Sequence, residues 1–594
     1  MKNPHRGRNV FLLLSSAFLI AAVMTLTYFS DAAPEAAETA ETQTSEAAVS
    51  DAIDDSLVQV IYLTARRGNE KERTNHTWAE LNARGAEYAE GAGVEAIVQI
   101  GDEYGPLPGA TGYGLNIPNA IVSATGSNSA AALQKSYKLK FKKASDNTRG
   151  ESTIVLKKYE SDGLRFRNKL CHDIGASMGL YASKTSFVHL YVNDETEAGS
   201  STESDAVFLD YGLFTRIEPQ DKQFLLRHGL DFYGQLYEAA DFDFKRNESV
   251  LMRETDPFFD PAAFDALLNR KNGGDHSKLL AMLDELNDEN IPITRVFEIY
   301  FDANNYFKWL AFQIICGNGK AAREGYGLYT PRGDAPFYFM LWNQSGAFMR
   351  YEKELTDWKY ELRGETVLEQ YGVTPFLKIT LHRRVLSEAK YREALHAEVQ
   401  EVLRQFEVGM YDDQIVDYKR VAEPFVFDMP DVMHAPLNRE RYDLVSKNIT
   451  AEARVMYDYY TDSLKRPAPF SPGAPIREGG VIVFSWEESF MLDGGGVTYM
   501  AELAPDYMFE RMLVKLDNLQ APVFTVAELT QGQYFLRVTA LSEAGDSRRM
   551  DCHYKSLYNT MHAGVQCFYV LADGSVAAAG NKTEAAVSDE IGWE

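Results

Sequence analysis

The stretch Phe297–Met349 reads FEIYFDANNYFKWLAFQIICGNGKAAREGYGLYTPRGDAPFYFMLWNQSGAFM and decides the fold. Its first half is apolar on every side, which predicts a helix over residues 301–315 that is buried all round. A polar turn follows over residues 317–324. Strand-forming runs at Tyr326–Thr330 and Pro336–Trp342 then predict a hairpin. We expect this helix and hairpin to form the centre of a larger mixed domain.

Polar side chains lie where the predicted helix and the predicted hairpin end. The turn offers Asn318 and Lys320, and the hairpin ends in Asn343, Gln344 and Ser345. Loops that leave rigid elements are common places for binding and catalytic groups. None of these side chains is a carboxylate, although a catalytic loop of this kind would be expected to carry one.

Composition excludes one class of partner and limits the number of domains. The 594 residues are too many for one core, and 45% hydrophobic content is ample for packed domains. The net charge of −26 argues against nucleic acid, because binding to phosphates needs clustered Lys and Arg.

The N-terminus predicts a location at a membrane. Basic residues precede an apolar run at 10–29, which at 1.5 Å per residue could cross a hydrocarbon core of ~30 Å. We therefore expect a membrane anchor or signal peptide at 1–30, with acidic residues behind it that place the bulk of the chain outside the cytoplasm. If the segment is cleaved, the protein is secreted or periplasmic. Residues 31–55 are Ala, Glu, Thr and Ser and predict a disordered acidic stalk.

The rest of the chain divides at a Pro-rich linker over residues 466–476. Before it, residues 56–465 mix strands and helices. After it, residues 477–580 contain short strands only, and 581–594 form a tail. The fold class is therefore α+β, with an all-β immunoglobulin- or fibronectin-like sandwich at the C-terminal side. The segment Leu529–Ala540 is similar to the tyrosine corner of fibronectin type III domains.

Several short motifs have an ordinary structural interpretation. Gly175–Gly179 fits the GxSxG string of hydrolases, but it closes a predicted helix and lacks the preceding strand that a nucleophile elbow needs. His172 and Asp173 are adjacent on that helix and cannot face each other, so we expect them at the surface. Whether Cys552 and Cys567 form a disulfide stays open at this point.

A set of segments, taken together, resembles the spore coat protein H (CotH) kinase family, which has an atypical protein-kinase-like fold. The segments cover about residues 57–464. They are the turn Gly126–Ser129 with the strand Gln134–Phe141, the helix motif Arg167–Leu170 with Gly179 and Leu180, the block Tyr211–Leu225, the run Gly234–Tyr237, the helix from Phe301 to Asn318, and Leu328, Tyr329 and Trp342 of the hairpin.

The resemblance implies ATP and Mg²⁺ as cofactors and assigns two nucleotide-binding residues. In the family a strand lysine contacts the nucleotide phosphates, and a glutamate that follows the strand with the Tyr-Thr motif orients this lysine. These roles fall on Lys135 and Glu218, with Lys138 as a substitute for Lys135. Phosphoryl transfer needs such cations, together with acids that hold the metal and orient the attacking hydroxyl.

The chain departs from the family where those acids belong. The resemblance places the base at Lys320, a metal-binding Asn at Gly325, and two hairpin acids at Asn343 and Ser345; an Arg position holds Thr125. No catalytic or metal-ligating residue is therefore assigned. An amide can offer Mg²⁺ an oxygen without a charge, whereas the Lys320 ammonium would repel the metal.

Three functions follow from the sequence. The first is an exported, membrane-anchored pseudokinase that binds nucleotide or an exported or surface protein without efficient phosphoryl transfer. The second is an active atypical Ser/Thr protein kinase acting on exported or surface proteins, with acids outside the motif as substitutes. The third is a surface adhesion or carbohydrate-binding protein in which the kinase fold is a scaffold.

Overall fold

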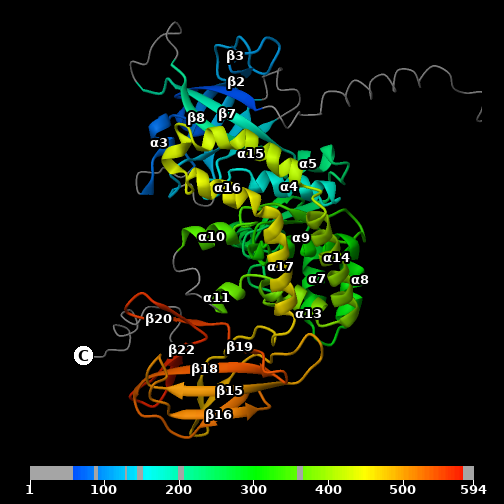
Figure 1. Cartoon of the computed structure of the whole chain (residues 1–594), viewed down its shortest axis with the longest axis vertical. Helices are drawn as coiled ribbons and strands as arrows, with labels where there is room; N and C mark the ends of the chain where they lie inside the picture. Colours follow the sequence, from blue (N-terminus) through cyan, green and yellow to red (C-terminus); the bar gives the residue numbers. More distant parts are fainter. Residues whose placement is uncertain are drawn as a thin grey trace, which may run out of the picture. The chain divides into compact units, whose positions relative to one another are not determined.

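The computed structural model describes residues 58–85, 91–126, 130–142, 152–197, 207–357 and 365–578 (Figure 1). From Val58 onward the chain belongs to one compact unit. Its fold class is α+β, as predicted, with mixed sheets and helices first and β-strands after residue 476. The stalk predicted at 31–55 and the tail at 581–594 lie outside the described residues, and the domain boundaries stay predictions.

The predicted membrane anchor requires a correction. Within the described ranges, no helix is both long enough and apolar enough to cross a membrane. This finding contradicts the anchoring helix, the membrane as a partner and the location at the cell membrane. The segment on which the prediction fell, residues 1–30, lies outside the described residues, and we do not carry these predictions further.

The N-terminal strands close into a ring. Their order is β1, β7, β8, β6, β5, β4 and β2, and β2 pairs back with β1; β3 extends β2. The pairing of β1 with β7 is parallel, and the other pairs are antiparallel. Closure satisfies both edges of the sheet. The bounds are β1 Gln59–Arg66, β2 Gly93–Asp102, β3 Gly105–Pro106, β4 Ala120–Thr125, β5 Ser136–Phe141, β6 Thr153–Lys157, β7 Thr185–Asp194 and β8 Leu209–Ile217.

Alternation along β5 decides which side chains fill the ring. Tyr137, Leu139 and Phe141 are buried in a core shared with the other strands, whereas Lys138 and Lys140 are exposed. This confirms the strand with one wet face that the sequence predicts. Trp78 of α3 (Trp78–Asn82) stacks on Tyr137 in that core, with ring centroids 5.1 Å apart.

A carboxylate from far along the chain reaches one end of this core. Asp431, in the short helix η6 (Asp431–His434), accepts hydrogen bonds from Gln134 Nε2 and Leu213 N, each at 2.9 Å. It also pairs with Lys158 Nζ at 2.7 Å, and both side chains are 1% exposed. Burial lowers the pKa of Lys158 to about 8, although Asp431 acts in the opposite direction. The bare backbone of Gly212 leaves room for Asp431, since a Cβ there would lie 2.3 Å from Oδ2.

The second sheet and the central helix form the helical part of the unit. The sheet runs β10, β9, β11, β12. Helix α9 (Ala303–Ile315) is buried along its length, which confirms the helix predicted to be buried all round. Asp302 caps its first turn by accepting from Asn305 N, and the chain leaves it through Gly317, whose φ is +68°. The strands are β9 Gln235–Ala239, β10 Leu268–Asn272, β11 Tyr326–Thr330 and β12 Tyr338–Leu341.

Further helices pack around α9 or against the ring. Helices α14 and α17 contact α9 directly, and α15 packs against α4 and β8. Figure 1 shows α14 and α17 beside α9, and α4 near α15. The helices are α4 Arg167–Ser177, α5 Lys222–Arg227, α6 Pro261–Leu267, α7 Ser277–Asn287, α8 Ile293–Tyr300, η4 Gly319–Ala322, α10 Arg350–Thr356, α11 Glu365–Leu368, α12 Thr374–Leu377, α13 Thr380–Leu386, α14 Ala389–Glu407, α15 Asp412–Val426, α16 Arg439–Lys447 and α17 Ile449–Ser463.

The C-terminal strands form two main sheets around one core. One sheet runs β13, β14, β17, and the other β16, β15, β18, β22, β23, with β19 on β18. The Tyr534 hydroxyl donates to the Thr530 carbonyl at 2.9 Å, which is the contact predicted for the tyrosine corner. Cys552 and Cys567 are free thiols. The strands are β13 Ile476–Glu478, β14 Val481–Ser485, β15 Val497–Ala504, β16 Val514–Leu519, β17 Val523–Val526, β18 Gly532–Ser542, β19 Ser547–Arg549, β20 His553–Lys555, β21 Met561–Ala563, β22 Gln566–Val570 and β23 Val576–Ala578.

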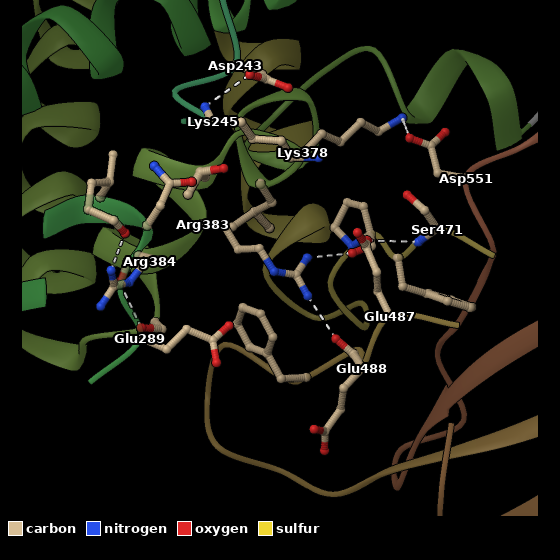
Figure 2. Close-up of a pocket in the computed structure, with 18 of the residues that line it drawn as sticks. Asp243, Lys245, Glu289, Lys378, Arg383, Arg384, Ser471, Glu487, Glu488 and Asp551 are labelled. Carbon is tan, nitrogen blue, oxygen red and sulfur yellow. Dashed lines mark hydrogen bonds and ion pairs between the residues drawn. The ribbon is translucent and has the colours of Figure 1, made fainter. Parts of the chain in front are cut away.

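Charged residues connect the helical part to the strands that follow. Arg383 donates to the carbonyls of Pro469 and Glu488, at 2.6 and 2.8 Å. Lys378 pairs with Asp551 at 2.9 Å (Figure 2). These contacts line a cavity of about 680 Å³ whose charged groups are largely engaged with each other or with backbone carbonyls.

The buried pair of Lys158 and Asp431 gives a stability prediction. Asp431→Asn keeps the shape and the acceptor oxygen but leaves the Lys158 charge without its partner, so we expect the free energy of unfolding to fall by about 3 kcal/mol. Chemical denaturation at neutral pH measures the change. The control Lys158→Met/Asp431→Asn removes both charges and should recover a large part of the loss; equal stability of Asp431→Asn and the wild type would contradict the prediction.

Candidate functional site

Buried amides fix the loop after α9 against the end of the hairpin. Asn318 Nδ2 donates to Gln313 Oε1 at 2.9 Å, to the Asn343 carbonyl at 3.3 Å and to Gln344 Oε1 at 3.4 Å. The side chains of Asn318, Gln313 and Gln344 are fully or almost fully buried. Asn343 N also donates to the Gly325 carbonyl at 2.9 Å. The two segments that the sequence singles out therefore form one rigid structure.

Lys320 and Asn343, at two of the expected acid positions, each have a partner within their own loop. Lys320 is exposed and lies 4.0 Å from the Glu324 carboxylate. Asn343 is also exposed, and its Oδ1 accepts the Ser345 N–H at 3.0 Å, an Asx turn within the loop. Gly325 has a φ of +72°, and a Cβ there would lie 3.0 Å from the Asn343 Cβ. A side chain at position 325 would therefore press against Asn343.

The donor groups present do not fit a magnesium ion. Mg²⁺ favours six oxygens in octahedral geometry and is usually held through one or two carboxylates and substrate phosphates. Over the described parts of the chain, no group of three or more His, Cys, Asp or Glu side chains could hold a metal ion. At the hairpin itself the side-chain oxygen of Asn343 is uncharged and already bonded to Ser345.

Glu218 has partners other than the lysine that the resemblance assigns to it. It accepts from Arg227 Nε at 2.6 Å, from His228 Nε2 at 2.8 Å and from Lys184 N at 3.2 Å. Burial alone would raise the pKa of Glu218, but the hydrogen bonds from His228 and Arg227 hold it below its ordinary value. Glu218 thus joins the end of β8 to α5.

Lys135 lies at the opposite end of the strands from Glu218. The register pairs Tyr137 with Leu156, and Val155 with Ile217. Lys135 is therefore level with the far end of β6, about four residues along the strand direction and two strands away from Glu218. Lys135 is 3% exposed, and burial lowers its pKa, as does nearby Arg84. The structure does not bring these two residues together. Lys138, the substitute for Lys135, pairs with Val155 and is therefore level with Ile217, which precedes Glu218. The nucleotide-binding roles stay predictions.

A different set of charged residues gathers where the ring faces the second sheet. Lys271 Nζ of β10 pairs with Glu238 Oε2 of β9 at 2.7 Å and lies 5.3 Å from the ring centroid of Trp342. Lys157 of β6 approaches from the ring; burial lowers its pKa, Glu238 raises it and Lys271 lowers it. Gly327 faces this group, with its missing Cβ 3.4 Å from the Trp342 indole. We call Lys157, Glu238, Lys271 and Trp342 the cleft cluster.

Of the cleft cluster, the sequence analysis singled out Trp342 and did not identify the three charged residues. The outward alternation along β5 and β6 could have indicated Lys157, because Ile154 and Leu156 are buried while Lys157 is half-buried. Glu238 and Lys271 carry no sequence signal, since their meeting depends on the antiparallel pairing of β9 with β10.

His172 joins the ring side of the site to the hairpin. Its Nδ1 accepts from Ser183 N at 3.2 Å, so its Nε2–H donates to the Trp342 carbonyl at 2.9 Å. The side chain is fully buried, which contradicts the expectation that His172 lies at the surface. The reason is that α4 packs between the ring and β12, so this face of the helix is covered.

The hydrolase-like string in the same helix has the structure predicted for it. Residues Gly175–Gly179 lie at the end of α4, with Met178 as its C-cap. The Ser177 hydroxyl donates to the Ile174 carbonyl at 2.7 Å, as a serine in a helix end does. This string is therefore a helix terminus. It is not a nucleophile elbow.

Comparison with known proteins gives a family. A family model described as CotH kinase protein matches residues 122–465. A search of curated proteins finds no match. The matched region contains β5, β6, α4, α9, the hairpin and the cleft cluster.

Burial of His172 predicts sensitivity to acid. Burial lowers its pKa from 6.5 to about 4, so between these values the unfolded chain binds more protons than the folded one. The free energy of unfolding therefore falls as the pH falls from 6.5 to 4, with about 3 kcal/mol from His172. Urea unfolding measured across this window should show a shallower pH dependence for His172→Gln. His553→Gln, at an exposed position, is the control, and equal slopes for wild type and His172→Gln would contradict the prediction.

Proposed function

Because this chain belongs to the CotH kinase protein family, we propose that it is a pseudokinase: it keeps the kinase fold, binds nucleotide without requiring a metal, and does not transfer phosphate efficiently. The observation that carries the proposal is the state of the loop and hairpin. The positions where the resemblance expects acids hold Lys320, Asn343 and Ser345, and the nearby amides bond one another.

Replacing these acids is expected to abolish turnover, which is more than a modest reduction in rate. Phosphoryl transfer depends on preorganised charge, and removing one such group commonly costs ~10²–10³ in rate. Here an ammonium, an amide and a hydroxyl replace three acids at once. The scaffold around them, including Asn318 and Gln344, remains closely packed.

An active kinase would need a substitute acid in the cleft. Glu238 is the carboxylate of the cleft cluster, and its position beside Trp342 makes it the candidate for that role. It is held by Lys271 at 2.7 Å, and Lys157 adds a second positive charge nearby. A carboxylate neutralised in this way is a poor ligand for Mg²⁺, because the metal would have to displace an ion pair.

In the same cluster, Lys157 and Lys271 support metal-independent binding of nucleotide. Two ammonium groups can neutralise phosphate oxygens where Mg²⁺ would otherwise do so. Lys135 stays the lysine assigned by resemblance. Its buried position and its distance from Glu218 make Lys157 the rival candidate.

Nucleotide binding and turnover are tested with the full-length protein. We expect ATP to raise the melting temperature equally with and without Mg²⁺ or Mn²⁺, and labelled ATP to leave no label on the protein or on casein. Lys157→Ala and Lys135→Ala decide which lysine binds the phosphates, because the temperature shift should shrink in only one of them; Lys140→Ala, on the exposed face of β5, is the control. Metal-dependent incorporation that disappears in either lysine variant would refute the pseudokinase proposal.

Restoring the acids provides a gain-of-function test. The variant Lys320→Asp/Asn343→Asp/Ser345→Asp should acquire Mg²⁺ or Mn²⁺ binding, seen as a stabilisation of about 1.4 kcal/mol when the metal is tenfold above its Kd. The matched control Lys320→Asn/Ser345→Asn places uncharged amides at the same positions and should not respond. Absence of a metal effect in the acidic variant would mean that the cleft has changed beyond these three positions.

A further inference from the structure

A separate cavity lies against the loop that carries Lys320. Its volume is about 470 Å³, within the range of small-molecule sites. Asn318 and Lys320 line it from the loop, but Trp342, Asn343 and Ser345 are not among its lining residues. It is therefore distinct from the cleft cluster. We call it the loop pocket.

Bare backbone forms part of the wall of the loop pocket. A Cβ at Gly319 would lie 2.3 Å from the Gln370 carbonyl oxygen, and a Cβ at Gly346 would lie 2.6 Å from Asn318 Oδ1. Both positions therefore require glycine for the segments to approach each other. The wall is consequently rigid and formed largely in advance of any ligand, which limits the entropy lost on binding.

The charges of the loop pocket favour an anion. Four cations line it (Lys320, Arg323, Lys353 and Lys378), together with three carboxylates (Asp241, Glu324 and Glu369). The lining therefore has a net charge of +1, in a chain whose net charge is −26. Such a local field attracts anions against the overall charge of the protein.

Two of the three carboxylates of the loop pocket have partners other than Lys320. Asp241 pairs with Arg323, and Glu369 pairs with Arg548, which lies outside the pocket, at 2.5 Å. Lys378 is drawn toward Asp551, as Figure 2 shows. Lys320, by contrast, has Glu324 only at the outer limit of an ion pair. Lys320 and Lys353 both line the pocket and are exposed, so their ammonium groups can reach a ligand in it.

An apolar wall completes the loop pocket. Tyr371, Pro375 and Ile379 line it, and the Tyr371 ring is fixed by stacking on Tyr459 with centroids 5.2 Å apart. A fixed aromatic ring beside a proline presents a surface suited to a flat hydrocarbon group. The pocket thus combines cations on one part of its surface with an apolar wall on another.

We propose that the loop pocket binds a small organic anion, a phosphate or carboxylate group attached to a flat apolar body. Lys320 and Lys353 bind the anionic group, and Tyr371 and Pro375 contact the body. The position that the resemblance assigns to a catalytic base has thereby changed the sign of its charge and gained a ligand of opposite charge. This goes beyond the proposed function, because it concerns a different cavity and does not require nucleotide in the cleft.

Calorimetry with simple probes tests the inference on the full-length protein. Phenyl phosphate and benzoate represent the two anionic groups, phenol lacks the charge, and inorganic phosphate lacks the apolar body. We expect binding of at least one aryl anion with a Kd below about 10 mM and at least tenfold weaker binding of phenol and of inorganic phosphate. The aryl anion that binds more tightly identifies the anionic group.

Reversing the charge of two pocket lysines tests whether the aryl anion binds in the loop pocket. Lys320→Glu/Lys353→Glu should weaken binding of the aryl anion at least tenfold, whereas Lys140→Glu/Lys515→Glu, the same change on two exposed lysines outside the pocket, should leave its Kd unchanged. ATP titrations on the same variants report on the cleft separately. Absence of binding by both aryl anions, equal binding of phenol, or an unchanged Kd in Lys320→Glu/Lys353→Glu would overturn the inference. Because all four lysines are exposed, the melting temperature of each variant should confirm that it folds.

Discussion

The buried amide of Asn318 is the constraint on which the site depends. Asn318 lies three residues after the end of the buried helix α9, and its side chain donates to Gln313 of α9, to the hairpin backbone and to the Gln344 amide. A buried amide that lost these partners would cost free energy in proportion to its unsatisfied groups, so the three segments cannot separate independently. The loop keeps its shape because of this network, whether or not the neighbouring positions carry acids. Replacement of those acids and preservation of the fold are therefore compatible.

Local sequence patterns were sufficient to predict several individual elements of this structure. The all-round apolar character of residues 301–315 predicts a buried helix, the alternation along β5 predicts a strand with one exposed face, and the Tyr534 segment predicts a hydroxyl contact that the structure contains. Each of these features depends on residues close together in the sequence, where periodicity and turn chemistry act directly.

Contacts between distant segments could not be predicted in the same way. The parallel pairing of β1 with β7 closes the ring, yet nothing in either strand specifies the other. The sequence predicts His172 at the surface because it cannot face the adjacent Asp173 on the helix, and only the packing of α4 against β12 explains its burial. Glu238 and Lys271 meet through a register shift between β9 and β10, a property of the sheet that no single strand encodes. The family resemblance supplied the fold, whereas the position of Lys135 relative to Glu218 follows from the register of β5, β6 and β8.

The contact of Asp431 with the ring has a consequence for the order of synthesis. The strands of the ring come from residues 59–217, but the carboxylate that neutralises Lys158 and accepts from Leu213 N follows more than two hundred residues later. A chain emerging from the ribosome therefore holds a complete set of ring strands with an uncompensated lysine at one end, until nearly the whole helical part has been made. The ring therefore gains the partner of Lys158 only when translation has reached residue 431, inside the family match that ends at residue 465, and any chain that stops earlier lacks that partner.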